Sequence, residues 1–194
     1  DLISWGAIGA RTTESQVDRQ LVSGLSMPVG FKNNSSGDMD IAANAMISAD
    51  YQHCFYGING NGKAAIVKTK GNKDTHVILR GSKYGTNYDI GSINDVKKTL
   101  KNKNLRENVM VDCSHGNSNK NYKNQMSVIE YAANILSENK DAMMGFMVES
   151  NMVEGKQTLV FGEADKLEWG KSITDSCVNL DETEEMIKNI YNIL

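Results

Sequence analysis

The sequence is poor in cysteine and has no long apolar run. Its 194 residues include three cysteines, Cys54, Cys113 and Cys177, at wide and irregular spacing, which does not resemble a disulfide framework. No apolar segment of the sequence reaches the roughly 18 residues that a membrane-spanning helix needs, and no signal-peptide pattern opens the chain. We therefore expect a globular protein of the reducing cytoplasm that does not insert into membranes.

A concentration of charge of one sign is also missing. The formal net charge is −3, with 21 Lys and Arg against 24 Asp and Glu. The lysine-rich stretch from Lys97 to Lys103 is typical of the solvated face of a helix. Aromatic and basic residues do not alternate as they do on RNA- or DNA-binding surfaces. The composition therefore argues against a nucleic-acid partner.

What the chain does contain is an alternation of short apolar runs with helical patterns. The runs predict strands at residues 3–8, 28–32, 76–80, 108–112 and 142–148, and the intervening patterns predict helices at residues 40–49, 93–101, 125–136 and 181–194, with a further helix that is capped within residues 13–16 and ends at residue 23. Strands joined by helices in this way are the pattern of a (β/α)8 TIM barrel, which usually needs about 250 residues. We predict an α/β fold in which residues 1–194 form a single domain that supplies about the last five βα units, without the upstream strands.

One pair of apolar runs does not fit the barrel alternation. Residues 53–58 and 64–69 are separated only by Asn59–Lys63, a link rich in Asn and Gly. Such a link forms a hairpin, and it is too short to join parallel strands. We predict an antiparallel hairpin at residues 53–69, inserted beside the barrel, and a second hairpin or irregular insert at residues 155–166.

Three basic residues follow predicted strands. Arg11, Lys32 and Arg80 each stand at or just after the end of an apolar run, where TIM-barrel enzymes carry their active sites. Arginine binds phosphate or carboxylate by forked hydrogen bonds, and lysine binds it as a point charge. The three suit a phosphorylated substrate, although surface salt bridges explain the arginines as well. Lys32 also suits the Schiff-base nucleophile of a metal-free aldolase.

Three further polar residues suit a divalent metal. His115 ends one predicted strand, Glu149 ends the next, and Asp175 follows in a loop. A carboxylate at the end of the apolar run 143–148 requires a partner or a metal, since isolated burial of its charge is very costly. A mixed His, Glu and Asp set favours Mn, Fe, Co or Zn. The alternatives are a structural histidine and a cap or turn role for Asp175; Cys113 is either a soft ligand or a packing residue.

These motifs, taken together and in order, carry a resemblance to a known family. They are residues 1–16 (DLISWGAIGARTTESQ), 28–33 (PVGFKN), 78–81 (ILRG), 114–118 (SHGNS), 147–150 (MVES) and 171–175 (KSITD). The chain closely resembles type I, microbial 3-deoxy-D-arabino-heptulosonate 7-phosphate (DAHP) synthase, from Asp1 to Leu194. The resemblance implies a metal-dependent condensation of phosphoenolpyruvate with erythrose 4-phosphate, with release of phosphate. This is the first step of the shikimate pathway to aromatic amino acids.

The resemblance also implies a role for each candidate residue. Those implied to bind phosphoenolpyruvate are Gly9, Ala10, Arg11, Lys32, Arg80 and His115. Those implied to hold the metal are His115, Glu149 and Asp175, and those implied to take part in catalysis are Lys32, His115 and Asp175. The metal would act as a Lewis acid on the aldehyde, and the electrostatic role implied for Lys32 disfavours the Schiff base.

The hairpin resembles the family's insert that forms a feedback pocket for an aromatic amino acid. Leu25, Ser26, Gly57 and Ile58 are the implied effector residues. Gly57 stands where some relatives carry serine, which leaves room for a ring hydroxyl. The resemblance therefore favours tyrosine over phenylalanine as the effector.

Family members carry an upstream segment with the first three barrel strands and a metal-binding cysteine, which this sequence lacks. Cys54, Cys113 and Cys177 do not occupy that cysteine's motif. Because five strands of a barrel leave two open sheet edges, we expect the chain to be unstable and inactive alone. We expect it to act in a homo-oligomer, a dimer or tetramer, together with the upstream half of the barrel. A non-catalytic fragment that binds only an aromatic effector is the remaining alternative.

Overall fold

The computed structural model describes residues 2–194 of the chain. Asp1, which opens the N-terminal motif, lies outside the described residues. The described residues divide into two compact units, residues 2–78 with 95–109 and residues 79–94 with 110–194. The expectation of a single domain over residues 1–194 stays a prediction. No helix within residues 2–194 is both long enough and apolar enough to cross a membrane.

The first unit is built on parallel strands. β1 (Gly6–Ile8), β2 (Val29–Lys32) and β5 (Thr75–Leu79) are hydrogen-bonded in that order, and the last residue of β5 belongs to the second unit. Every residue of β2 and β5 is buried, as in parallel sheets that are covered on both faces. β1 is shorter than the predicted strand at residues 3–8, and Ile3, at the start of that prediction, is exposed.

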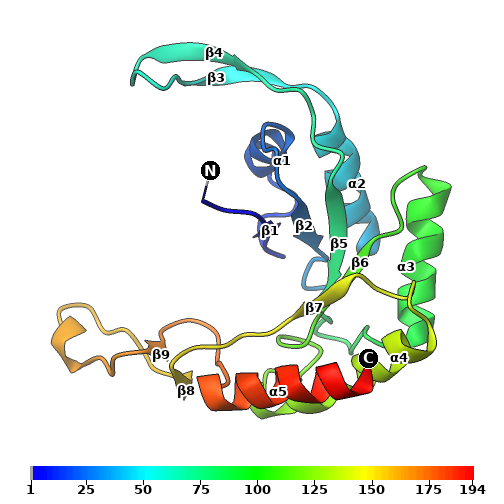
Figure 1. Cartoon of the computed structure of the whole chain (residues 1–194). Helices are drawn as coiled ribbons and strands as arrows, with labels where there is room; N and C mark the ends of the chain where they lie inside the picture. Colours follow the sequence, from blue (N-terminus) through cyan, green and yellow to red (C-terminus); the bar gives the residue numbers. More distant parts are fainter. Residues whose placement is uncertain (1) are drawn as a thin grey trace. The chain divides into compact units, whose positions relative to one another are not determined.

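Helices α1 (Gln16–Ser23) and α2 (Met39–Asp50) follow β1 and β2 and pack against each other (Figure 1). The cap of α1 is Ser15, whose hydroxyl accepts a hydrogen bond from the backbone N–H of Asp18. Thr13, two residues earlier, is fully buried. The segment before α1 therefore both caps the helix and enters the core.

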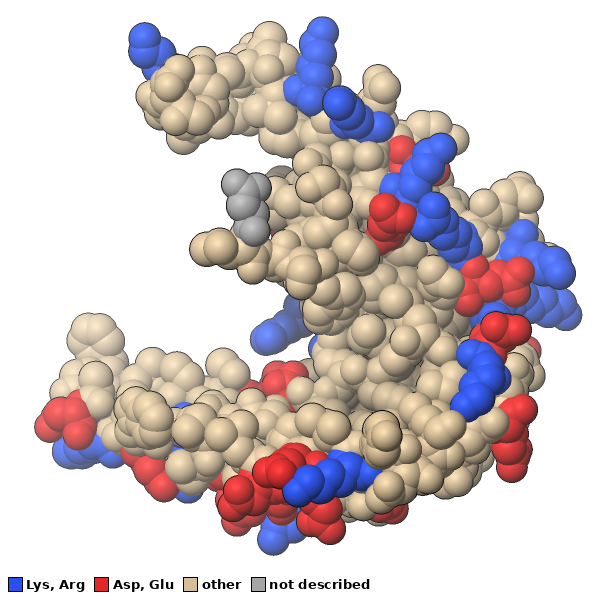
Figure 2. Space-filling model, in the orientation of Figure 1, with Lys and Arg blue, Asp and Glu red and all other residues tan. Residues whose placement is uncertain are grey.

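An antiparallel hairpin, which lies between α2 and β5 in the sequence, extends from the first unit (Figure 1). β3 (Cys54–Ile58) and β4 (Ala64–Lys68) pair over five residue pairs. The side-chain oxygen of Asn59 accepts hydrogen bonds from the backbone N–H groups of Asn61 and Lys63 and closes the turn. The charged side chains of this arm are lysines, and Figure 2 shows it as mainly uncharged surface with basic side chains.

The second unit has its own parallel pair of strands. β6 (Val109–Asp112), of which all but the first residue belong to this unit, pairs with β7 (Gly145–Met147). β7 is shorter than the predicted strand at residues 142–148. α4 (Gln125–Glu138) connects the two strands after a short 3-10 turn, Tyr122–Asn124.

Two further α-helices are α5 (Leu180–Ile193) and α3 (Ile90–Asn102). α5 packs along α4 in the second unit (Figure 1). Asn179 and Glu182 form a capping box at its start, and Asp181 and Glu182 in the first turn suit the positive end of the helix dipole. α3 is divided between the two units.

Residues 155–166 form an irregular segment rather than a hairpin. β8 (Val153–Lys156) pairs in parallel with β9 (Lys171–Ser172), and the 3-10 helix Ala164–Lys166 lies between them in the sequence. Both units thus combine parallel strands with helices, as an α/β fold requires. The number of βα units in a barrel stays a prediction.

Gly30 in β2 provides a test of packing in the first unit. A Cβ atom at this position would overlap Ile78 Cδ1 and lie 2.7 Å from His76 Nε2. We expect Gly30→Ala to lower the free energy of unfolding by about 1–3 kcal/mol, since overpacking forces neighbouring atoms to shift. Gly60→Ala is the matched control, because nothing lies within 4 Å of a Cβ added there. Urea unfolding of the protein that contains this chain measures both effects, and equal stability of the two variants would contradict the packing.

Candidate functional site

His115 lies in a tight loop after β6. Its backbone φ angle of 56° is in the left-handed region, which is uncommon for residues other than glycine. The His115 carbonyl accepts hydrogen bonds from the Lys120 N–H at 2.8 Å and the Ser118 hydroxyl at 3.3 Å. The loop therefore holds the backbone of this residue in a conformation that it would rarely adopt alone.

The side chains of His115, Glu149 and Asp175 meet in the second unit. Nε2 of His115 lies 3.8 Å from Oε1 of Glu149 and 3.4 Å from Oδ2 of Asp175. One donor atom of each residue lies within 4.8 Å of the other two. Such separations suit ligands that share one ion at about 2.0–2.2 Å, and one nitrogen with two carboxylate oxygens suits a borderline to hard divalent metal. The three residues therefore fit a bound divalent ion.

The backbone of Glu149 is anchored by a buried amide. Gln125, the first residue of α4, is fully buried. Its Oε1 accepts from the Glu149 N–H at 2.8 Å, and its Nε2 donates to the Glu149 carbonyl at 3.1 Å. Glu149 lies past the end of β7. There the Gln125 side chain provides hydrogen-bond partners of the kind that a neighbouring strand provides within the sheet. The position of this carboxylate is therefore set by α4 as well as by β7.

Asp175 is the most exposed member of the cluster. Its side chain is 54% exposed, against 14% for His115 and 30% for Glu149. The loop that carries it is fixed by two backbone hydrogen bonds between Cys177 and Gly155. Burial, and then the charge of Glu149, raise the pKa of the Cys177 thiol.

The structure favours packing over metal binding for Cys113. Its side chain is fully buried, and its thiol donates to the carbonyl of Val111 at 4.0 Å. Burial and the neighbouring Asp112 carboxylate raise the pKa of this thiol. Within residues 2–194, Cys113 is not part of the cluster that could hold a metal.

Arg80 follows β5 and lies beside the His115 loop. The backbone N–H of Gly116 donates to the Arg80 carbonyl at 3.0 Å. A Cβ atom on Gly116 would lie 2.5 Å from the backbone nitrogen of Ser82, so the close approach of the two loops requires glycine. A backbone hydrogen bond from Gly116, the residue after His115, thus connects the loop of the predicted metal ligand to Arg80, the predicted anion-binding residue.

The first unit holds the other predicted anion-binding residues, Gly9, Ala10, Arg11 and Lys32. The Thr13 hydroxyl donates to the carbonyls of Gly9 at 3.0 Å and Lys32 at 2.8 Å. One buried hydroxyl therefore ties the loop after β1, which carries Arg11, to the end of β2, where Lys32 is only 9% exposed.

The predicted effector residues also lie in the first unit. Leu25 and Ser26 come just after α1, and the α1 residue Ser23 donates from its hydroxyl to Thr69 Oγ1 at 2.8 Å. The end of α1 is thereby fixed to the base of the hairpin, next to the two predicted effector residues.

Gly57 and Ile58 lie at the other end of β3. Ile58 is 74% exposed. A Cβ atom on Gly57 would lie 2.7 Å from Val67 Cγ2, so the Val67 side chain takes up part of the room that a serine would fill. Effector binding, and the preference for tyrosine, stay predictions.

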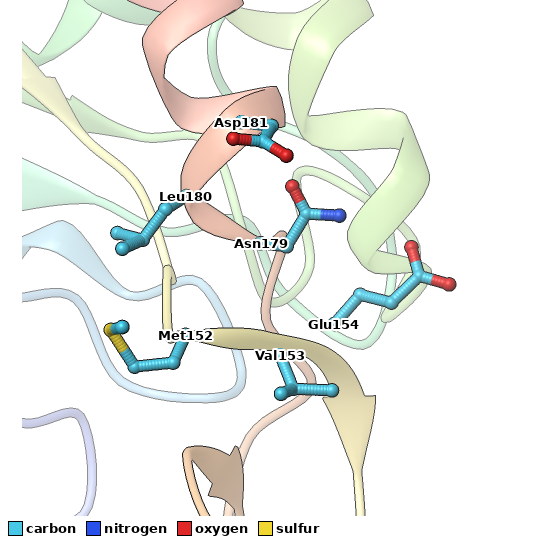
Figure 3. Close-up of a pocket in the computed structure, with 6 residues that line it drawn as sticks. All are labelled: Met152, Val153, Glu154, Asn179, Leu180 and Asp181. Carbon is cyan, nitrogen blue, oxygen red and sulfur yellow. The ribbon is translucent and has the colours of Figure 1, made fainter.

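A cavity of about 350 Å³ opens in the second unit beside the start of α5. It is lined by Met152, Val153, Glu154, Asn179, Leu180 and Asp181 (Figure 3). Figure 3 shows the first three on the chain around β8 and the last three at the N-terminal end of α5. These lining residues do not include any predicted site residue, so the cavity and the metal-ligand cluster are separate features.

The sequence analysis missed the buried polar residues behind the cluster. Asp112 is fully buried, and Asn117, which is 2% exposed, donates from its side chain to the carbonyls of Leu79 and Asp112. A charge at the end of a buried strand, three residues before His115, was the available signal for Asp112. Gln125 gave no signal, because a polar residue at a helix start is ordinary.

We expect Gln125→Leu to lower the free energy of unfolding by about 1–3 kcal/mol, because it leaves the backbone N–H of Glu149 without its acceptor. The matched control is Gln52→Leu, at an exposed position. Urea unfolding of the protein that contains this chain measures both changes. A loss no larger than that of the control would mean that the Gln125 amide does not anchor Glu149.

Comparison with known proteins agrees over nearly the whole chain. The model of the DAHP synthetase I family matches residues 1–188. The Phe-sensitive phospho-2-dehydro-3-deoxyheptonate aldolase of Escherichia coli K12 is 47% identical over 192 residues, which cover 99% of this chain and 54% of that protein. The Tyr-sensitive enzyme of the same strain is 44% identical over 194 residues, which cover 100% of this chain and 54% of that protein.

A solved structure shares the fold. The phospho-2-dehydro-3-deoxyheptonate aldolase of Francisella tularensis SCHU S4 superposes with a TM-score of 0.91 at 43% sequence identity, over 99% of this chain and 55% of that one. The chain spans about half the length of the curated relatives it matches. With the family model matched over residues 1–188, the chain belongs to the DAHP synthetase I family.

Proposed function

We propose that the protein containing this chain is a metal-dependent DAHP synthase, which condenses phosphoenolpyruvate with erythrose 4-phosphate and releases phosphate. The observation that carries the proposal is the convergence of His115, Glu149 and Asp175 in a chain of this family. The aldolase names of the relatives support the same reaction.

The basic residues bind the anionic groups of phosphoenolpyruvate. The guanidinium groups of Arg11 and Arg80 match phosphate and carboxylate by forked hydrogen bonds, and Gly9 and Ala10 belong to the loop that carries Arg11. Lys32, at the end of β2, balances the phosphate charge as a point charge. The link through Thr13 keeps Arg11 and Lys32 at the same edge of the strands.

Bond formation requires polarisation of the aldehyde of erythrose 4-phosphate. His115, Glu149 and Asp175 would hold a divalent ion, Mn, Fe, Co or Zn, which would supply the Lewis acidity for this. C3 of phosphoenolpyruvate attacks the aldehyde carbon, water adds at C2, and the proton that this water loses passes to the former aldehyde oxygen, which becomes a hydroxyl. Asp175, the most exposed of the three side chains, is placed to accept the proton of that water. Phosphate leaves as its C–O bond to the tetrahedral C2 breaks.

Feedback control belongs to the same proposal. The relatives include Phe-sensitive and Tyr-sensitive enzymes. In this chain Leu25, Ser26, Gly57 and Ile58 form the effector site, with tyrosine as the preferred ligand. The active protein is a homo-oligomer, a dimer or tetramer, that includes the upstream half of the barrel.

Phosphate release tests the reaction. We expect the protein to release phosphate only when both substrates and Mn²⁺ are present, and a chelator to stop the release. His115→Ala and Glu149→Ala should abolish turnover, because each removes a metal ligand. Arg80→Ala should instead raise the KM for phosphoenolpyruvate, by an amount equivalent to about 2–4 kcal/mol, because a charged contact is lost. Unchanged kinetics in these variants would defeat the assignment.

The Schiff-base aldolase remains the competing reaction, and Lys32 separates the two. Borohydride in the presence of substrate should not trap a covalent adduct on Lys32 if its role is electrostatic. Metal-independent turnover together with a trapped adduct would favour the aldolase. Retained activity in Lys32→Arg would exclude it, since arginine keeps the charge but does not form a Schiff base.

Calorimetry tests the effector. We expect tyrosine to bind more tightly than phenylalanine, and Gly57→Ser to weaken tyrosine binding by about 10-fold, the equivalent of one lost or obstructed hydrogen bond. Gly60→Ser in the hairpin turn is the control, because nothing lies within 4 Å of a Cβ added there. Tighter binding of phenylalanine by the unchanged protein would overturn the preference, and aromatic binding without metal or phosphoenolpyruvate binding would favour the non-catalytic fragment.

A further inference from the structure

His115 can bind a metal through Nε2 in only one of its two neutral tautomers. Nε2 must present its lone pair, so the ring proton must be on Nδ1. Nε2 faces the carboxylates of Glu149 and Asp175. Nδ1 lies 2.9 Å from Oδ2 of Asp112. The ring is therefore placed between the candidate metal site and a third carboxylate.

The Asp112 carboxylate is built into the end of β6. It is fully buried, and its Oδ1 accepts the backbone N–H of Ser114 at 2.9 Å. This bond leaves Oδ2 directed at the imidazole of His115. A buried carboxylate that receives a backbone N–H on one oxygen is a strong acceptor for a ring N–H on the other.

The contact between Asp112 and His115 is short but bent. Nδ1 is buried and makes no hydrogen bond within the described residues, although Oδ2 of Asp112 lies 2.9 Å away, which is hydrogen-bonding distance. The ring torsion of histidine is broad, so a rotation of the ring would align the N–H with Oδ2. The backbone of His115 is already held by Lys120 and Ser118, so the ring orientation depends on what Nδ1 contacts.

We propose that Asp112 is a positioning residue, which holds His115 in the Nδ1–H tautomer with Nε2 directed at the metal site. The inference rests on the proposed metal-dependent function. Carboxylates behind metal-bound histidines typically change metal affinity by about 10–100-fold. Asp112 therefore contributes to metal binding without touching the ion.

Asp112→Asn keeps the shape of the side chain but replaces the hydrogen-bond acceptor that faces Nδ1 of His115 with a donor. An asparagine NH2 group cannot accept a hydrogen bond, so the amide oxygen stays with the Ser114 N–H and the NH2 group faces Nδ1 of His115. Nδ1 then has to accept, and the ring proton moves to Nε2. The variant should therefore present a proton, instead of a lone pair, to the metal site.

Nitrogen-15 NMR of the metal-free protein that contains this chain reads the tautomer directly. The chain has three histidines, and the other two serve as internal references. Trp5 Nε1 donates to Nε2 of His76 at 3.2 Å, which assigns that ring the Nδ1–H tautomer. Nε2 of His53 lies 2.7 Å from the Ser48 carbonyl, which assigns that ring the Nε2–H tautomer. His115→Gln identifies the remaining signal by its loss.

We expect His115 to give the Nδ1–H pattern in the unchanged protein and the Nε2–H pattern in Asp112→Asn. Mn²⁺ affinity, measured by calorimetry, should fall by about 10–100-fold in the variant, while the His53 and His76 signals stay in place. Asp89→Asn is the matched control, since Asp89 also accepts a serine backbone N–H at 2.9 Å, from Ser92. It should change neither the tautomer of His115 nor the affinity for Mn²⁺.

An unchanged His115 tautomer in Asp112→Asn would overturn the inference, and so would a changed tautomer with unchanged Mn²⁺ affinity. The tautomer is measured without metal and without substrate. A failure of the synthase reaction with a normal tautomer switch would therefore count against the proposed function, whereas the absence of the switch in an active synthase would count against the role of Asp112.

Discussion

The candidate metal cluster depends on the burial of one carboxylate, that of Asp112. A charge removed from water is stable only when hydrogen-bond donors surround it. Ser114 supplies a backbone N–H to Oδ1, and Nδ1 of the His115 ring lies 2.9 Å from Oδ2, so the chain after β6 folds back over the end of its own strand. His115, with its left-handed backbone, lies in this reversal. On our proposal, Asp112 sets the orientation of His115 without being a metal ligand itself.

The same logic applies at the neighbouring strand ends, where the ladder hydrogen bonds stop and buried backbone groups still need partners. Gln125 satisfies both polar groups of the Glu149 backbone, and Asn117 satisfies the carbonyls of Leu79 and Asp112. In the first unit Thr13 does the same for Gly9 and Lys32. Each of these side chains replaces a strand neighbour, and each thereby fixes a loop that carries a candidate functional residue.

Sequence reasoning selected as candidates the residues that interrupt a pattern, and it missed the buried polar residues that support them. His115 and Glu149 interrupt or end apolar runs, so each signals an unusual demand at its position. Gln125 and Thr13 lie in polar segments next to helix starts, where such residues are expected in any case, and their burial arises only when the chain folds. The sequence did not decide between a hairpin and an irregular insert at residues 155–166. The partner of β8 is β9, which lies beyond this segment, so the segment itself contains no pattern that reveals the pairing.

The exposure of the three candidate ligands rises along the chain, from 14% for His115 through 30% for Glu149 to 54% for Asp175. The two less exposed residues each lie against a buried polar side chain, Asp112 beside His115 and Gln125 beside the backbone of Glu149. A catalytic metal site needs rigid ligands on one side and an open side for substrate and water. The gradient agrees with the proposed metal site, because the two ligands next to the strand ends would set the ion's position and the loop ligand Asp175 would lie on the more open side.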